Sequence, residues 1–176
     1  MLYLIAGIIS ALIILADQLS KAYVVANIPL ANSASDTAPL IKGLIDITHV
    51  HNNGGAWGML GGHTWILLAL TLLIMIVCVA MLVKNGFKSK TLFVSICFIL
   101  AGGIGNMIDR VFNGGIVVDF LQFHFWPEFP VFNIADIFVC IGAGLLLLYY
   151  ILDILKERKL RKARLIEANI IAEEQK

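Results

Sequence analysis

The chain has 176 residues, of which 60% are hydrophobic and only 14% are charged, and its mean hydropathy is +0.90. A soluble domain of this length could not bury so much apolar surface, whereas a bilayer can accommodate it. The formal charge of +1 excludes no partner, but the distribution of basic residues is informative. The three cysteines fall within apolar stretches without metal-ligand spacing, so we interpret them as small buried residues.

Four apolar stretches predict an all-α membrane protein, because each is close to the roughly 20 residues that a helix needs to cross the hydrocarbon. They comprise about residues 2–25, 64–83, 91–111 and 137–155. The first stretch differs from a secretory signal peptide because it has no basic start and no convincing cleavage site, and it contains two charged residues. We therefore expect a retained helix, one integral-membrane domain over 1–176, and a basic tail over 156–176.

Lys and Arg predict the orientation, because they gather in cytoplasmic connections. Three lysines occur within 84–90 and six basic residues within 156–164, whereas 26–63 holds one and 112–136 holds none. Both termini are therefore expected in the cytoplasm, with the two basic-poor connections outside. The basic cluster of the tail suits anionic headgroups. The alternative is a solvated helix end that also sets the topology.

The outer connections contain two distinctive segments. Residues 44–51 are rich in β-branched residues and predict a short strand, which residues 52–58 follow as a turn. Residues 120–132 are strongly aromatic, and Phe125 and Trp126 suit the membrane–water interface. This segment is either a simple interfacial belt or a lid over a lipid-exposed site.

Three carboxylates lie toward the outer face. Asp109 ends the third apolar stretch, Asp136 begins the fourth, and Asp119 lies in the connection between them. An ionised carboxylate in or beside hydrocarbon is costly, so its presence is itself a functional hypothesis. Several acids gathered near one membrane face indicate acid–base chemistry at that face.

Other polar residues in the helices need partners. Asp17 and Lys21 are four residues apart and share a helix face. They form an intrahelical pair with Lys21 extending toward the interface, or they hold the bundle or a loop. Asn106, Asp109 and Arg110 lie within one turn. Arg110 would keep Asp109 ionised, which favours a structural ion pair over a proton donor.

Asp119 and Asp136 differ because no Lys or Arg lies near them in sequence. Two carboxylates brought together without a cation cannot both ionise easily, so they share a proton. That is the state an aspartic protease needs, because one carboxylate activates water while the other protonates the carbonyl oxygen. The sequence does not show that the two residues meet, and Asp136 could instead cap a helix.

Other chemistries fit less well. HExxH is absent and His49 and His51 have no third ligand, so we expect no metal. Ser20 and Lys21 point apart on a helix, which disfavours a Ser–Lys dyad. No phosphate loop or nucleic-acid signature occurs, so no cofactor or nucleic acid is expected. A proton or cation relay would distribute acids through the bilayer, and a lipid-binding scaffold would need no uncompensated acids.

Five motifs, in order along nearly the whole chain, resemble the lipoprotein signal peptidase family, also called signal peptidase II. They are DQLSK (17–21), NGGAWG (53–58), GNMIDR (105–110), VVDF (117–120) and FNIAD (132–136). The resemblance implies four transmembrane helices with a small β element and an aromatic segment on the outer face. It also implies a bacterial inner-membrane location with the active site toward the outer face.

The same resemblance implies the chemistry. The substrate would be a diacylglyceryl-modified prolipoprotein, cut before the lipidated cysteine, and the membrane lipid and the inhibitor globomycin would be further ligands. Asp119 and Asp136 would be the catalytic pair. The residues expected to bind substrate or support the site are Asn53, Gly55, Asn106, Asp109, Arg110, Asn133, Asp17 and Lys21.

The orientation can be tested with a reporter fused after Lys176. If Lys84, Lys90 and the basic tail stay on the cytoplasmic side, a reporter that works only in the cytoplasm should be active. A reporter that works only after export should be silent at the same position. Activity of the exported reporter instead would overturn the orientation and place the carboxylates at the inner face.

Overall fold

Four long helices make up most of the computed structural model, which describes residues 2–33, 36–85 and 89–174. Lys88 of the basic connection therefore lies outside the described residues. The elements in chain order are α1 (Leu2–Asn27), β1 (Ala38–Ile41), β2 (Ile45–Asn52), the short 3-10 helix η1 (Ala56–Gly58), α2 (Thr64–Asn85), α3 (Lys90–Phe112), β3 (Val117–Phe123) and α4 (Ile134–Glu174). All four helices are long and apolar enough to cross a membrane, which confirms the predicted fold class.

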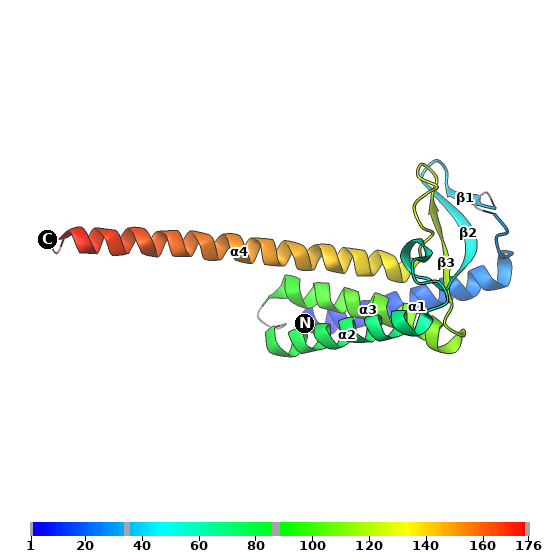
Figure 1. The fold of residues 1–176 in the computed structure, drawn as a ribbon, viewed down its shortest axis with the longest axis horizontal. Coiled ribbons are helices and arrows are strands. Elements are labelled where there is room, and N and C mark those ends of the chain that lie inside the picture. The colour runs from blue at the N-terminus through cyan, green and yellow to red at the C-terminus, as the bar shows by residue number, and fades with distance from the viewer. Residues whose placement is uncertain (1, 34–35, 86–88, 175–176) are drawn as a thin grey trace.

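The helices and the sheet occupy different ends of the molecule (Figure 1). The three strands lie at one end of the helix bundle. The N-terminus and the connection between α2 and α3 lie at the other end, and α4 continues well beyond it toward the C-terminus. The two basic segments named above are thus at the same end, opposite the sheet.

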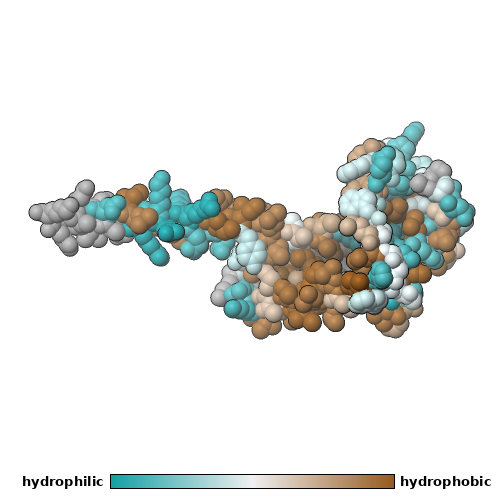
Figure 2. All heavy atoms as spheres, viewed as in Figure 1, coloured by the Kyte–Doolittle hydropathy of each residue, from teal (hydrophilic) through white to brown (hydrophobic). Residues whose placement is uncertain are grey.

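Helix α3 is the centre of the bundle. In the most apolar part of α3, 56% of the residues are buried, whereas 6% are buried in the corresponding parts of α2 and α4. The apolar side chains of α2 and α4 therefore face outward. Figure 2 shows the resulting hydrophobic surface over the bundle. Two glycines let neighbouring segments approach α3: a Cβ at Gly105 would lie 2.7 Å from Asp17 Oδ2, and one at Gly102 would collide with the carbonyl oxygen of Ala135. The absence of a side chain at these two positions therefore permits close packing.

The small sheet is antiparallel in the order β1-β2-β3. Strand β2 confirms the strand predicted over 44–51, whereas β1 and β3 were not predicted. Strand β3 is apolar on both faces and buried along most of its length, so it lacks the simple alternation that marks a half-exposed strand. Its register places Asp119 opposite Val50, and a bridge joins Leu121 to Phe132. Strand pairing therefore brings Asp119 close to the start of α4.

Candidate active site

Asp119 is held on β3 with its carboxylate almost fully buried, at 2% exposure. Both of its oxygens accept hydrogen bonds from amide side chains. Asn52 Nδ2 donates to Oδ2 at 2.7 Å, and Asn133 Nδ2 donates to Oδ1 at 2.6 Å. Two neutral donors thus fix the orientation of this carboxylate without neutralising it.

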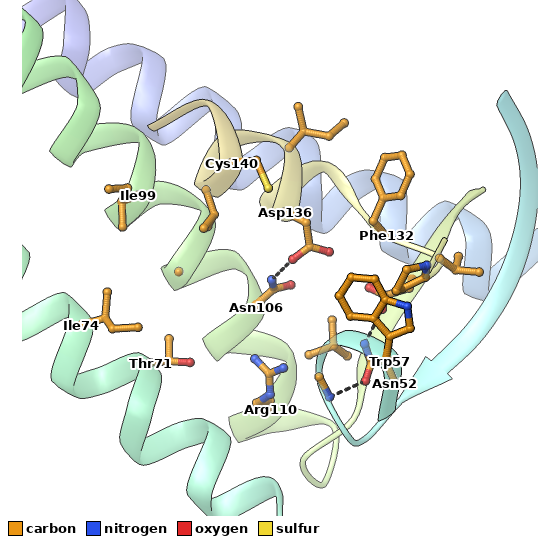
Figure 3. Close-up of a pocket in the computed structure, with 18 of the residues that line it drawn as sticks. Asn52, Trp57, Thr71, Ile74, Ile99, Asn106, Arg110, Phe132, Asp136 and Cys140 are labelled. Carbon is orange, nitrogen blue, oxygen red and sulfur yellow. Dashed lines mark hydrogen bonds between the residues drawn. The ribbon is translucent and has the colours of Figure 1, made fainter. Parts of the chain in front are cut away.

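Asp136 is held in the first turn of α4. Its Oδ1 accepts a hydrogen bond from Asn106 Nδ2 at 2.8 Å (Figure 3). Its Oδ2 accepts one from the backbone N–H of Asn133 at 3.1 Å. Asn133 Oδ1 in turn accepts a hydrogen bond from the Asp136 backbone N–H at 3.0 Å. This reciprocal arrangement has the pattern of a capping box. Asp136 therefore both caps α4, which begins three residues earlier than expected, and faces the candidate site.

Asn133 connects the two carboxylates. Its side chain is fully buried and donates to Asp119, while its backbone N–H donates to Asp136. Asp119 and Asp136 line one cavity of about 590 Å³. Within the described part of the chain, no direct hydrogen bond joins them, so both carboxylates remain able to act on a molecule between them.

The surroundings of Asp119 favour its protonated form. Burial is the largest cause, and the negative charge of Asp136 is the next; together they raise the pKa of Asp119 from 3.8 to about 7. The hydrogen bonds from Asn52 and Asn133 and the more distant charge of Lys21 oppose this rise only in part. Near neutral pH, Asp119 can therefore hold or release a proton.

Lys21 is the buried cation next to the site. Its Nζ lies 2.8 Å from Asp17 Oδ2 and 3.0 Å from Asp109 Oδ2, and it donates to Asn106 Oδ1 at 3.0 Å. The side chain is only 4% exposed, so the expectation that Lys21 extends toward the interface is wrong. The expected ion pair of Asp109 with Arg110 is also wrong, because packing of α1 against α3 gives Asp109 a different cation.

Asp17 and Asp109 each reach a backbone group beside one of the candidate catalytic residues. Asp17 Oδ1 accepts a hydrogen bond from the N–H of Ala135 at 2.9 Å, and Asp109 Oδ2 accepts one from the N–H of Val118 at 3.1 Å. These two N–H groups immediately precede Asp136 and Asp119 in the chain. The ion cluster around Lys21 therefore positions the start of α4 and strand β3 together.

Gln18 completes this cluster, although the sequence analysis did not nominate it. Its Nε2 donates to Asp109 Oδ1 at 3.0 Å and to the carbonyl oxygen of Gly105 at 3.1 Å. It also lies 3.2 Å from Asp17 Oδ2. Its place between Asp17 and Lys21 in the DQLSK motif was the available signal, but an uncharged side chain on a helix gives no indication of its partners.

Arg110 points from α3 into the cavity (Figure 3). The residue is only 9% exposed, yet its Nε is buried and has no hydrogen-bond partner among the described residues. A guanidinium has five N–H donors and is always charged, so an unpaired one is costly unless a ligand supplies acceptors. Arg110 therefore lines the cavity with a buried donor that no described residue satisfies.

The turn after β2 shows which of two adjacent asparagines contacts the site. Asn52 bonds to Asp119, whereas Asn53 is exposed and has no hydrogen bond to either candidate carboxylate in the described structure. Asn52 lies two residues after Val50, the cross-strand partner of Asp119, and such diagonal neighbours are within reach. Gly55 lines the cavity with φ +70°, a conformation that suits glycine, and a Cβ there would lie 3.1 Å from Leu67 Cδ2. The strand register that selects Asn52 was not visible in the sequence.

Aromatic side chains form the outer wall of the cavity. Phe123, Phe129 and Phe132 line it, and Trp57 packs edge-on against Phe129 with ring centroids 6.0 Å apart. Other aromatic residues of the same segment, such as Trp126 at 50% exposure, remain outside. The segment thus lines the cavity with one group of rings and exposes another group at the surface.

The inner part of the cavity is apolar and lies among α2, α3 and α4. Ile74, Ile99 and Ile141 contribute to it. Cys140 also lines it and is exposed, so the expectation of three buried cysteines is wrong at this position. An apolar chain can therefore occupy the same cavity that presents Asp119 and Asp136.

The fold and the site together define a multi-pass membrane protein with a polar centre at one end of its bundle. It is similar to two solved bacterial membrane enzymes. The first aligns with a TM-score of 0.75 and 31% sequence identity, and the alignment covers 84% of this chain and 88% of the solved chain. The second aligns with a TM-score of 0.70 and 32% sequence identity, and the alignment covers 82% of this chain and 91% of the solved chain.

Sequence comparison identifies the family. Residues 9–152 match the model of signal peptidase (SPase) II. A lipoprotein signal peptidase of Bacillus pumilus is 42% identical over 147 residues, which are 83% of this chain and 92% of the relative. A lipoprotein signal peptidase of Enterococcus faecalis is 41% identical over 146 residues, which are 83% of this chain and 87% of the relative. The chain belongs to the signal peptidase II family and is therefore a bacterial membrane peptidase.

Replacing Lys21 by Met should strongly destabilise the protein. The substitution would leave the buried carboxylates of Asp17 and Asp109 without their cation, and breaking a buried ion pair costs roughly 3–5 kcal/mol. Thermal unfolding in detergent should show a large fall in Tm, whereas Lys42→Met in the exposed turn between β1 and β2 should change it little. If Lys21→Met unfolds at the parent temperature, the ion cluster does not hold the bundle.

Proposed function

We propose that this chain is an aspartic endopeptidase that removes the signal peptide from diacylglyceryl-modified prolipoproteins, cutting before the lipidated cysteine. The observation that carries the proposal is the convergence of Asp119 and Asp136 on one cavity, joined through the buried Asn133. The relatives named lipoprotein signal peptidase support the substrate class. The apolar inner part of the cavity fits a substrate that is itself embedded in the membrane.

The chemistry uses one proton on the pair. The pKa of Asp119 is raised to about 7, so this residue can carry the proton of the pair near neutral pH. We propose that Asp119 acts as the acid and Asp136 as the base. Asp136 takes a proton from water as the water oxygen attacks the scissile carbonyl carbon, and Asp119 gives its proton to the carbonyl oxygen. When the tetrahedral intermediate collapses, Asp136 protonates the leaving nitrogen and Asp119 recovers its proton from the hydroxyl group.

The remaining polar residues have distinct proposed roles. Arg110 donates to a carbonyl oxygen of the substrate, which would satisfy the buried Nε–H that has no hydrogen-bond partner among the described residues. Asn106 and Asn133 hold the two carboxylates in position, and Gly55 gives the substrate space beside Asn52. A contact of the exposed Asn53 with substrate stays a prediction. Globomycin-type inhibitors would occupy the same cavity.

We also propose that the cavity faces the outer side of the bacterial inner membrane. The support is that β2, β3 and the start of α4, which contribute residues to the cavity, lie at the end of the bundle opposite the N-terminus and the connection of α2 with α3 (Figure 1). Basic segments stay in the cytoplasm. The reporter experiment described above tests this sidedness independently of catalysis.

Substituting either catalytic residue should abolish cleavage without unfolding the protein. Asn keeps the size of Asp in Asp119→Asn and Asp136→Asn but cannot exchange the proton, so product should fall below detection when purified protein is incubated with a lipidated prolipoprotein. The two residues act as one unit, so the double variant should be hardly worse than either single variant.

A matched control is available in Asp46→Asn. Asp46 is also a buried carboxylate at the sheet end, at 9% exposure, but it bonds to His124 and does not line the cavity. This variant should keep near-parent turnover. Near-normal turnover of Asp119→Asn or Asp136→Asn would instead rule out the proposed mechanism.

The raised pKa of Asp119 predicts a pH dependence of stability that needs no substrate. Below about pH 4 the carboxyl is protonated in both the folded and the unfolded state. Between its ordinary value of 3.8 and about 7, the unfolded chain releases the proton that the folded protein retains. The free energy of unfolding therefore falls as pH rises through this window. The Tm of the parent in detergent should decline with pH more steeply than that of Asp119→Asn, and parallel curves would contradict the raised pKa.

A further inference from the structure

We propose that α4 binds anionic phospholipid headgroups through a basic collar just beyond the bundle. The basic collar consists of six cationic residues, which are Lys156, Arg158, Lys159, Arg161, Lys162 and Arg164. This interaction lies outside the proposed peptidase site and does not depend on it. The ligand class is the phosphate of an acidic lipid, such as phosphatidylglycerol.

The six cations of the basic collar have no acidic partner among the side chains that the structure describes. Every residue from 156 to 164 is exposed, and Glu157 is the single acid among them. No side chain of the six cations forms an ion pair or a hydrogen bond with another described side chain. The collar therefore presents a dense positive charge that is free to bind phosphate groups.

The arrangement around the helix fits a membrane surface. Successive residues of an α-helix are rotated by roughly 100°, so six cations within nine positions point in all directions around α4. A partner protein would bind one face of the helix, whereas headgroups surround a helix that leaves the bilayer. The distribution thus favours lipid over a partner with a single binding face.

The position along α4 places the basic collar at the headgroup layer. From Ile134 to Leu155 the helix is roughly 33 Å long, close to the hydrocarbon thickness of a bilayer of about 30 Å. Leu152, Ile154 and Leu155 are still apolar and exposed, and the collar begins at the next residue. Figure 2 shows this change from hydrophobic to hydrophilic surface along α4.

Two further observations separate the basic collar from the peptidase site. The residues that match the family model end at 152, before the collar begins. Strand β3 and the start of α4, which hold Asp119 and Asp136, lie at the opposite end of the bundle (Figure 1). Lys84 at the end of α2 and Lys90 at the start of α3 lie at the same end as the collar and provide a matched control.

The test compares two double variants of the full-length protein in detergent. Arg158→Gln/Lys159→Gln removes two charges of the basic collar, and Lys84→Gln/Lys90→Gln removes two charges from the neighbouring connection. Native mass spectrometry during a titration with phosphatidylglycerol gives the affinity, with phosphatidylcholine as the neutral lipid. Both variants should keep the parent Tm, because these exposed side chains do not contribute to the core.

The collar variant should bind phosphatidylglycerol roughly ten-fold more weakly than the parent, and the connection variant should change the affinity much less. Binding of phosphatidylcholine should be equal in all three proteins, and added salt should weaken the phosphatidylglycerol complex of the parent. Equal losses in the two double variants would overturn the proposal, because they would reflect the general charge of this face. A short RNA can be titrated in the same way. If the collar variant loses affinity for the RNA but keeps the parent affinity for phosphatidylglycerol, the proposal is overturned and the ligand is a nucleic acid.

Discussion

The buried ammonium of Lys21 is the interaction on which the site depends. It lies between two carboxylates that would otherwise be ionised without a partner, since Asp17 and Asp109 are both at most 3% exposed. Each carboxylate uses a further lone pair to accept an N–H of the residue that precedes a candidate catalytic aspartate. One cation on α1 thus fixes the relative positions of α3, β3 and α4, because a buried charge permits few alternative arrangements.

The hydrogen bonds that hold the candidate catalytic pair come from neutral donors. Asp119 and Asp136 receive hydrogen bonds from the neutral amides of Asn52, Asn106 and Asn133, whereas Lys21 donates to Asn106 and forms no ion pair with either carboxylate in the described structure. A lysine in direct contact would favour the ionised form and lower the carboxyl pKa. Neutral donors orient the two groups and leave the pKa of Asp119 near 7, where one proton can be exchanged.

The molecule separates its two kinds of membrane contact. The cavity combines carboxylates, the free Arg110 guanidinium and an apolar inner part that faces helices embedded in lipid. The basic collar lies at the far end of the same α4 helix that begins with Asp136. Helix α4 therefore links the proposed chemistry at one face to the proposed headgroup contact at the other, and its rigid length sets their separation.

Local properties of the chain were sufficient to predict the four helices, the strand over 44–51 and the carboxylates at one end of the bundle. Hydrophobic length and motif composition depend only on neighbouring residues, so they can be read without a fold. The partners of the polar groups depended on tertiary structure: Lys21 pairs with Asp109 across 88 positions, and Asn52, not Asn53, reaches Asp119 through the register of β2 with β3. Such contacts are decided by how helices and strands pack, because a charged or amide side chain can satisfy its hydrogen bonds with many residues and only the packed fold selects among them.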